Sequence, residues 1–312
     1  MHVCLWKKWI LAIAIIFNGA ICYASEEMLL SRYHYGSLVW DGARHEKAAV
    51  VPYFISSDST RINDVIYPRF NIGDAESKAL QEEHKLSVKL VEKKKIKLDQ
   101  KVNTILEGFP YDDITIRNLL NHRSGLPNYA NVLWNGRKAM MDREKPISNQ
   151  DVLNIFAEHN VKQIRPADKG FYYSNTNFAF LALVIEKITK MPYPKAMKYM
   201  VFDPLEMENT FVFEYDRDKD TVARSYKYNG YEWAWDDFDR TYGDKNIYST
   251  PRDLFKLDIA MYSDDFLPRK IKKEAFKGYS YEQKGYKNYG LGMRLLEYDN
   301  GKKLLYHNGW WH

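Results

Sequence analysis

The spacing of apolar and polar positions divides this chain into strand-like, helical and again strand-like segments. Short β-type runs occupy 37–40 and 48–55 and are separated by turn-forming residues. Helical spacing follows at 76–98, 114–121, 149–159 and 176–190. Two later runs, 289–298 and 302–307, flank Asp299-Asn300-Gly301, and Asn-Gly between apolar runs is a strong hairpin signal because both turn residues need positive φ. This order predicts a sheet interrupted by a helical domain.

Two helix starts are clearly marked in the sequence. Asn175 or Thr176 can cap the helix 176–190, whose apolar positions predict a core element. Thr250-Pro251-Arg252-Asp253 combines a capping hydroxyl, a proline at the first helical position and an acid at the third. We therefore expect a second helix from residue 251 onward.

The first 24 residues are typical of an export signal. Lys7 and Lys8 precede a short apolar run at 9–17, and Cys22-Tyr23-Ala24 offers small residues at a cleavage site. An N-terminal membrane anchor is the alternative, and a lipid anchor at Cys22 is disfavoured by bulky Ile21. We expect an exported protein, periplasmic or extracellular, without a stable membrane span after signal removal. At the other end, the strand run 302–307 would leave an unpaired sheet edge.

Composition and charge exclude several classes of function. The 312 residues carry 46 Lys and Arg against 41 Asp and Glu, a net charge of +5, which gives no basic excess for nucleic acid. The histidines show no helical pairing and no cysteine partners, so no metal site is expected. No phosphate loop or dinucleotide fingerprint occurs, and we expect no cofactor.

Three stretches carry candidate chemistry. They are residues 114–126, which contain I-T-I-R-N-L-L-N-H-R-S-G-L, then Tyr173-Ser174-Asn175, and finally His307-Asn308-Gly309. Taken singly, they are usually a turn, a helix cap and a loop. Their order and spacing along one chain make the combination informative.

With these motifs, the chain resembles the serine β-lactamase and penicillin-binding-protein-like family, on the side of class C β-lactamases, D,D-peptidases and esterases. The similarity runs nearly continuously from 98 to 312. It implies an α/β (α+β) fold of the β-lactamase/transpeptidase type, with an antiparallel sheet flanked by helices and an inserted, mostly helical part. The sheet would take 25–72 and 285–312, and the helical part 73–284. Relatives continue with more strands, so the domain 25–312 is expected to be truncated at its C-terminus.

The resemblance also implies roles for individual residues. A serine in S-x-x-K would be the nucleophile, and Tyr173 would shuttle its proton, helped by cationic neighbours. Asn175 would bind a substrate amide, and His307 would complete the polar site with Gly309. The Trp310 N–H would be one oxyanion donor and the N–H of the nucleophilic serine the other.

The nucleophile motif itself departs from the family pattern, because no S-x-x-K occurs in the sequence. Counting from the flanking residues places the serine position at Asp74 or at Ser77. Lys78 is adjacent to Ser77, and neighbours on a helix point about 100° apart. Ser77 is the candidate catalytic serine, with Tyr173 and His307.

Two functions therefore remain open from the sequence. The first is an exported serine hydrolase acting on a β-lactam, a D-Ala-D-Ala-type peptide of peptidoglycan or a small ester. The second is an inactive family member that serves as a binding or scaffold protein of the cell envelope. A truncated or locally scrambled version of an active relative is a third possibility. The oligomeric state is not indicated.

An aromatic segment allows one more hypothesis. Trp233, Trp235, Phe238 and Tyr242 could form a stacking platform for cell-wall sugars. Ordinary packing in a lid or core is the favoured interpretation.

Overall fold

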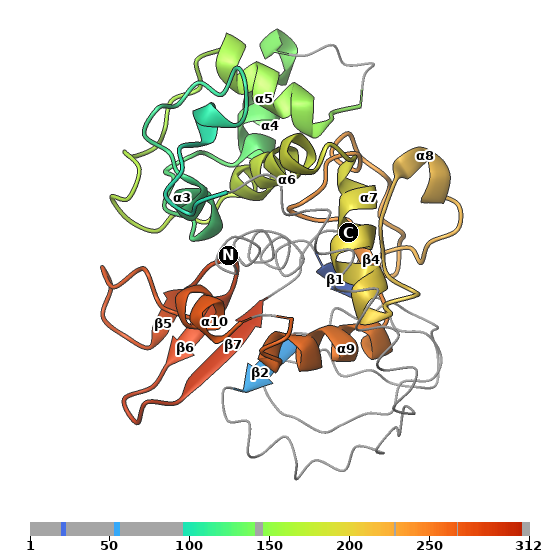
Figure 1. The fold of residues 1–312 in the computed structure, drawn as a ribbon. Coiled ribbons are helices and arrows are strands. Elements are labelled where there is room, and N and C mark those ends of the chain that lie inside the picture. Colours follow the sequence, from blue (N-terminus) through green and yellow to red (C-terminus); the bar gives the residue numbers. More distant parts are fainter. Residues whose placement is uncertain are drawn as a thin grey trace.

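Along the described chain, helices lie between early and late strands, as predicted, but two short strands at 211–212 and 247–249 interrupt the helical part (Figure 1). The protein is seen in a computed structural model, which describes residues 20–22, 53–56, 96–140, 146–227, 229–266 and 268–307. The helical middle of the chain lies on one side of the antiparallel sheet (Figure 1). Helix α10 (Arg269–Ala275) lies beside that sheet, and its Ala275 carbonyl accepts the Leu291 N–H. The predicted strand 37–40 lies outside the described residues. Of the predicted helix 76–98 only the last three residues are described, and they are not helical.

The larger sheet has the strand order β2-β7-β6-β5, with every pair antiparallel. Its strands are β2 (Tyr53–Ser56), β5 (Lys287–Tyr289), β6 (Arg294–Glu297) and β7 (Lys303–His307). The predicted turn at 299–301 joins β6 to β7, and Gly301 has φ 80°. The hairpin prediction is therefore confirmed, but of the two turn residues Asn300 and Gly301 only Gly301 has the expected positive φ.

Two expectations about this sheet are wrong. Strand β7 is not an edge, because β2 pairs along it from Tyr53 opposite His307. The run 289–298 is not one strand, because β5 ends at Tyr289 and β6 begins at Arg294. Between them Gly292 adopts φ 83°, and its N–H donates to the carbonyl of Leu120 at 2.9 Å. The turn is therefore tied to the helical part instead of continuing the strand.

The smaller sheet has the order β1-β4-β3. Its strands are β1 (Ala20–Cys22), β3 (Phe211–Val212) and β4 (Ile247–Ser249), with β1 parallel and β3 antiparallel to β4. Strand β1 falls within the predicted export signal 1–24, which stays a prediction.

The helices begin where the sequence provides caps. Thr115 and Ser148 form capping boxes with the third residues of their helices, and Thr250 accepts the Asp253 N–H. Asn175 occupies the N-cap position before residue 176, as one of the two predicted caps, although its side chain makes no capping bond. The helical elements are η2 (Val102–Thr104), α3 (Ile116–Leu120), α4 (Tyr129–Met140), α5 (Asn149–Glu158), α6 (Thr176–Thr189), α7 (Tyr193–Met197), the π-helical η3 (Lys198–Phe202), η4 (Asp203–Leu205), α8 (Tyr215–Asp218), α9 (Pro251–Tyr262) and α10 (Arg269–Ala275).

Helix α6 is the central element of the described core. Its residues from Thr176 to Ile185 are all buried, and it packs against α3, α5 and α7. Phe180 meets Phe109 and Phe156 edge to face, at ring distances of 5.5 and 5.6 Å. A helix buried along most of its length is a rigid support for the residues that precede its first turn.

Candidate active site

Tyr173 and Asn175 lie on the short segment that leads into α6. The carbonyl of Asn175 accepts the N–H groups of Phe178 and Ala179, so this segment is continuous with the helix. Both side chains are half-buried, and the Asn175 amide is not used for capping. The segment thus presents a phenol and an amide from the end of a fixed helix.

His307 meets this segment from the end of β7. Its side chain is buried, and the centroids of the His307 and Tyr173 rings are 6.2 Å apart. The Tyr289 hydroxyl lies 3.1 Å from His307 Nε2. Burial raises the pKa of Tyr289 well above its usual value, so this phenol stays protonated and can hydrogen-bond to the imidazole. Two of the candidate residues are therefore brought together from positions 134 residues apart in the sequence.

Arg294 supplies a positive charge to the same cluster, and no sequence motif singles it out. Its guanidinium carbon lies 5.1 Å from the centre of the Tyr173 ring. The Arg294 Nε is buried and has no hydrogen-bond partner within the described part of the chain. Arg294 lies on β6, where it is paired with Tyr289 of β5 on one side and with Tyr306 of β7 on the other. The family resemblance predicts a cationic neighbour for Tyr173, and Arg294 occupies such a place.

His122 is a second residue whose place in the cluster only the structure reveals. It follows α3, within the block 114–126, and its side chain has no exposed surface. The His122 ring lies 4.3 Å from that of Tyr173 and 4.8 Å from that of Tyr289. A histidine was visible in the motif, but no local pattern indicated that it would pack against the tyrosine.

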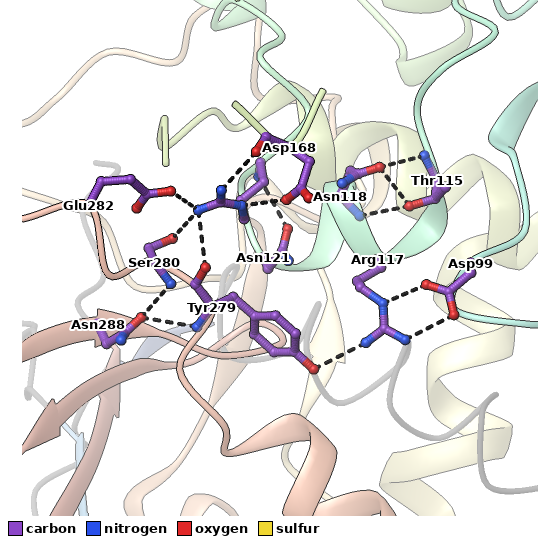
Figure 2. Close-up of polar contacts among 11 residues, drawn as sticks. Asp99, Thr115, Arg117, Asn118, Asn121, Asp168, Tyr279, Ser280, Glu282 and Asn288 are labelled. Atoms are coloured by element: carbon purple, nitrogen blue, oxygen red, sulfur yellow. Dashed lines mark hydrogen bonds and ion pairs between the residues drawn. The ribbon is translucent and has the colours of Figure 1, made fainter. Parts of the chain in front are cut away.

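Two arginines of the same block connect the loop at 279–282 to α3 and the residues that follow it. Arg123 contacts Asp168, Ser280, Glu282 and the carbonyl of Tyr279, while Arg117 contacts Asp99, Glu274 and the Tyr279 hydroxyl. Figure 2 shows Tyr279 between these two groups of partners, with Asn288 of β5 bonding to the backbone of the same loop. Hydrogen bonds from Tyr279 and Arg117 lower the pKa of Glu274, which keeps this carboxylate charged. The network fixes the loop that leads into β5 and hence Tyr289.

A buried polar group supports α6 from the other side. The Tyr129 hydroxyl donates to Asp244 at 3.0 Å, Lys245 contacts both residues, and the Tyr129 N–H donates to Thr176 at 2.7 Å. Burial, and then the Asp244 charge, raises the pKa of Tyr129. This group anchors the first turn of α6, directly after Asn175.

The remaining candidates lie outside the described residues. These are Ser77, Gly309 and Trp310. Within the described ranges, no group of three or more His, Cys, Asp or Glu side chains is arranged to hold a metal ion. No described helix is long and apolar enough to cross a membrane.

The aromatic segment is mostly packed. Phe238 is buried, and Tyr242 stacks on Tyr193 with ring centroids 5.0 Å apart. Trp235 stacks on Phe213 at 5.1 Å, whereas Trp233 keeps 43% of its surface exposed. Packing therefore accounts for three of the four aromatic residues.

Comparison with known proteins shows the family to which the chain belongs. The family model described as Beta-lactamase matches residues 86–312, a range that begins after Ser77. Penicillin-binding protein 4* of Bacillus subtilis is 31% identical over 72% of this chain and 53% of its own length. The teichoic acid D-alanine hydrolase of Staphylococcus aureus is 27% identical over 58% of this chain and 41% of its own length. The chain thus spans about half the length of the curated relatives it matches.

A solved structure gives the same fold. The octameric penicillin-binding protein homologue from Pyrococcus abyssi superimposes with a TM-score of 0.56 at 22% identity, over 72% of this chain and 54% of that one. At this identity the likeness concerns the fold alone. It confirms the expected β-lactamase/transpeptidase-like architecture of helices and a small antiparallel sheet.

Proposed function

Because the chain belongs to the β-lactamase family, we propose that it is a serine hydrolase that forms an acyl-serine intermediate on a D-alanyl peptide or ester or on a β-lactam. The observation that carries the proposal is the meeting of Tyr173 and His307, 6.2 Å apart between ring centres. A half-buried phenol beside a buried imidazole and a guanidinium is an arrangement suited to moving a proton.

The proposed reaction assigns each candidate residue one task. The Ser77 oxygen attacks the substrate carbonyl while its proton passes to the Tyr173 oxygen, and Tyr173 gives up its own hydroxyl proton to the departing alcohol or amine. Water repeats the sequence in reverse to release the acid and restore the serine. Asn175 binds a substrate amide, and the N–H groups of Ser77 and Trp310, next to Gly309, stabilise the oxyanion.

The choice of a D-alanyl substrate is supported by the names of the relatives. One is a penicillin-binding protein and the other a teichoic acid D-alanine hydrolase. Both names are compatible with a substrate whose carbonyl group can acylate a serine. Because this chain covers about half of each relative, the substrate class remains part of the proposal.

The second candidate function is binding without turnover at the cell envelope. It is favoured by the absence of S-x-x-K from the sequence, since Ser77 has Lys78 beside it instead of a lysine one helical turn away. In that case the chain would hold a peptidoglycan-type peptide without forming a covalent bond.

Covalent labelling separates the two functions. The purified chain is incubated with a fluorescent penicillin and, separately, a fluorophosphonate, and peptides are mapped by mass spectrometry. The hydrolase proposal predicts one adduct on Ser77 that disappears in Ser77→Ala. A folded protein with no adduct on any serine would leave the binding function standing and exclude the hydrolase.

Export is a separate proposal. The cationic and apolar pattern of residues 1–24 supports cleavage after Ala24. Expression in a bacterial host followed by N-terminal sequencing of the periplasmic protein should find Ser25 first. Retention of Met1 in that fraction would contradict cleavage and favour the membrane anchor.

A further inference from the structure

His122 contacts Tyr173 and the residues on both sides of it. The His122 carbonyl accepts the Tyr172 N–H at 2.8 Å, and its Nδ1 accepts the Ser174 N–H at 3.2 Å. The Tyr173 ring packs on the imidazole between these two bonds, with ring centroids 4.3 Å apart. His122, which follows α3, therefore holds Tyr173 through the backbone N–H groups of the residues on each side of the tyrosine and through contact with the tyrosine ring.

The hydrogen bonds specify which form of the imidazole is present. Besides the Ser174 N–H, Asn177 Nδ2 lies 2.9 Å from His122 Nδ1. The orientation of this amide follows from Ser124, whose Oγ accepts the Leu126 N–H and donates to Asn177 Oδ1 at 2.5 Å. Two donors thus face Nδ1, so this nitrogen carries no proton and the neutral ring is the Nε2–H tautomer.

The surroundings keep the ring neutral. Burial lowers the pKa of His122 well below its ordinary value, and the electrostatic effects of His307 and of the Arg294 guanidinium lower it further. The other titratable groups that face it are Tyr173 and Tyr289. A proton on Nδ1 would also oppose the Ser174 and Asn177 N–H groups.

We propose that His122 is the positioning residue for Tyr173. As a neutral Nε2–H imidazole it holds the tyrosine beside β7, and it no longer does so when the Nδ1 acceptor is removed. The inference rests on the proposed function in one respect, since that function makes Tyr173 the residue that moves the serine proton. The geometry around His122 stands independently of catalysis. His122 is not a catalytic residue, since it acts through Tyr173.

The backbone conformation suggests a pair of informative variants. His122 has φ 55°, a left-handed conformation that asparagine tolerates better than most residues. His122→Asn keeps an acceptor near Nδ1, whereas His122→Leu keeps the bulk and loses the acceptor. His159→Leu, at the exposed histidine that follows α5 with φ −94°, is the control for the loss of an imidazole elsewhere in the chain.

Amide hydrogen exchange tests the position of the acceptor without requiring activity. The Ser174 N–H should exchange about 5–10-fold faster in His122→Leu than in the parent protein, and near the parent rate in His122→Asn and His159→Leu. The Tyr172 N–H should stay protected in every variant, because its partner is a backbone carbonyl. Equal protection of Ser174 in the parent and in His122→Leu would overturn the inference.

Nitrogen NMR of the parent protein tests the tautomer, whether or not the leucine variant folds. We expect His122 as Nε2–H and still neutral at a pH at which a free imidazole is charged. A proton on Nδ1, or titration of His122 in the range of a free imidazole, would contradict the proposal.

Acylation kinetics then test the consequence for the site. His122→Leu should lower the rate of Ser77 labelling by about 10²-fold with little change in the half-saturating penicillin concentration, and His122→Asn should restore most of that rate. If the parent forms no adduct, the proposed function fails, while exchange and NMR still decide the role of His122.

Discussion

Replacing Gly125 with alanine should destabilise the protein more than the same change at a glycine of equal backbone conformation. Gly125 has φ 73°, and an added Cβ would lie 1.9 Å from the carbonyl oxygen of Arg165. Gly108 has φ 77°, but its Cβ would meet nothing within 4 Å. The pair separates the cost of a left-handed backbone from the cost of the steric overlap.

The magnitudes follow from these two contributions. A left-handed conformation costs an alanine about 1–2 kcal/mol, which is the expected loss of unfolding free energy for Gly108→Ala. Overlap with a backbone carbonyl requires the two segments to move apart, and such overpacking costs about 1–3 kcal/mol more. We therefore expect Gly125→Ala to lose about 2–5 kcal/mol.

Urea unfolding of the two variants provides the measurement. The midpoint should fall further for Gly125→Ala than for Gly108→Ala, with unchanged dependence on urea in both. Losses that agree within about 0.5 kcal/mol would refute the steric argument. Because Ser124 bonds to Asn177 beside His122, a displaced Gly125 should also slow Ser77 labelling, whereas Gly108→Ala should not.

Three further changes test other parts of the structure. Thr115→Ala removes the cap of α3 and should cost about 0.5–2 kcal/mol of unfolding free energy in the same urea assay. Lys245→Met leaves the buried Asp244 charge uncompensated and should cost about 3–5 kcal/mol, part of which the double variant with Asp244→Asn should restore. Because the pKa of His122 is lowered in the folded protein, this imidazole takes up a proton near pH 6.5 in the unfolded chain but stays neutral at that pH in the folded chain. Stability should thus fall as the pH drops below 6.5, by at most about 1.4 kcal/mol per pH unit, and His122→Asn should flatten that slope in urea titrations at several pH values. A larger or unchanged slope in this variant would contradict that assignment.

Features encoded by neighbouring residues could be predicted from the sequence. The cap at Thr250 and the turn ending at Gly301 both depend on residues within one turn of the chain, and both are present. The helix 176–190 was predicted to within one residue of its observed end, because its apolar positions face a core on nearly every side.

Features set by distant partners could not be predicted in this way. The pairing of β2 with β7 joins segments some 250 residues apart, and it turns a predicted edge into an interior strand. The break after Tyr289 depends on a hydrogen bond from Gly292 to Leu120 in the helical part. Neither contact has a signal in local periodicity.

The candidate site shows the same division. Tyr173, Asn175 and His307 could be named because the family motifs carry them. Arg294 and His122 were missed, since their importance lies in a cross-strand register and in ring packing. A sheet register combined with the three motifs would have placed Arg294 beside the tyrosine.

The role of Tyr173 in moving the serine proton can be measured from the rate at which Ser77 is acylated. Stopped-flow labelling with a fluorescent penicillin compares the parent, Tyr173→Phe and Tyr172→Phe, the last being a neighbouring half-buried tyrosine whose ring faces Arg165. If Tyr173 moves the serine proton beside His307, Tyr173→Phe should slow acylation by about 10²–10⁴-fold, while Tyr172→Phe stays close to the parent rate. Equal acylation rates in the two variants would contradict the assignment of Tyr173 and the active site built on it.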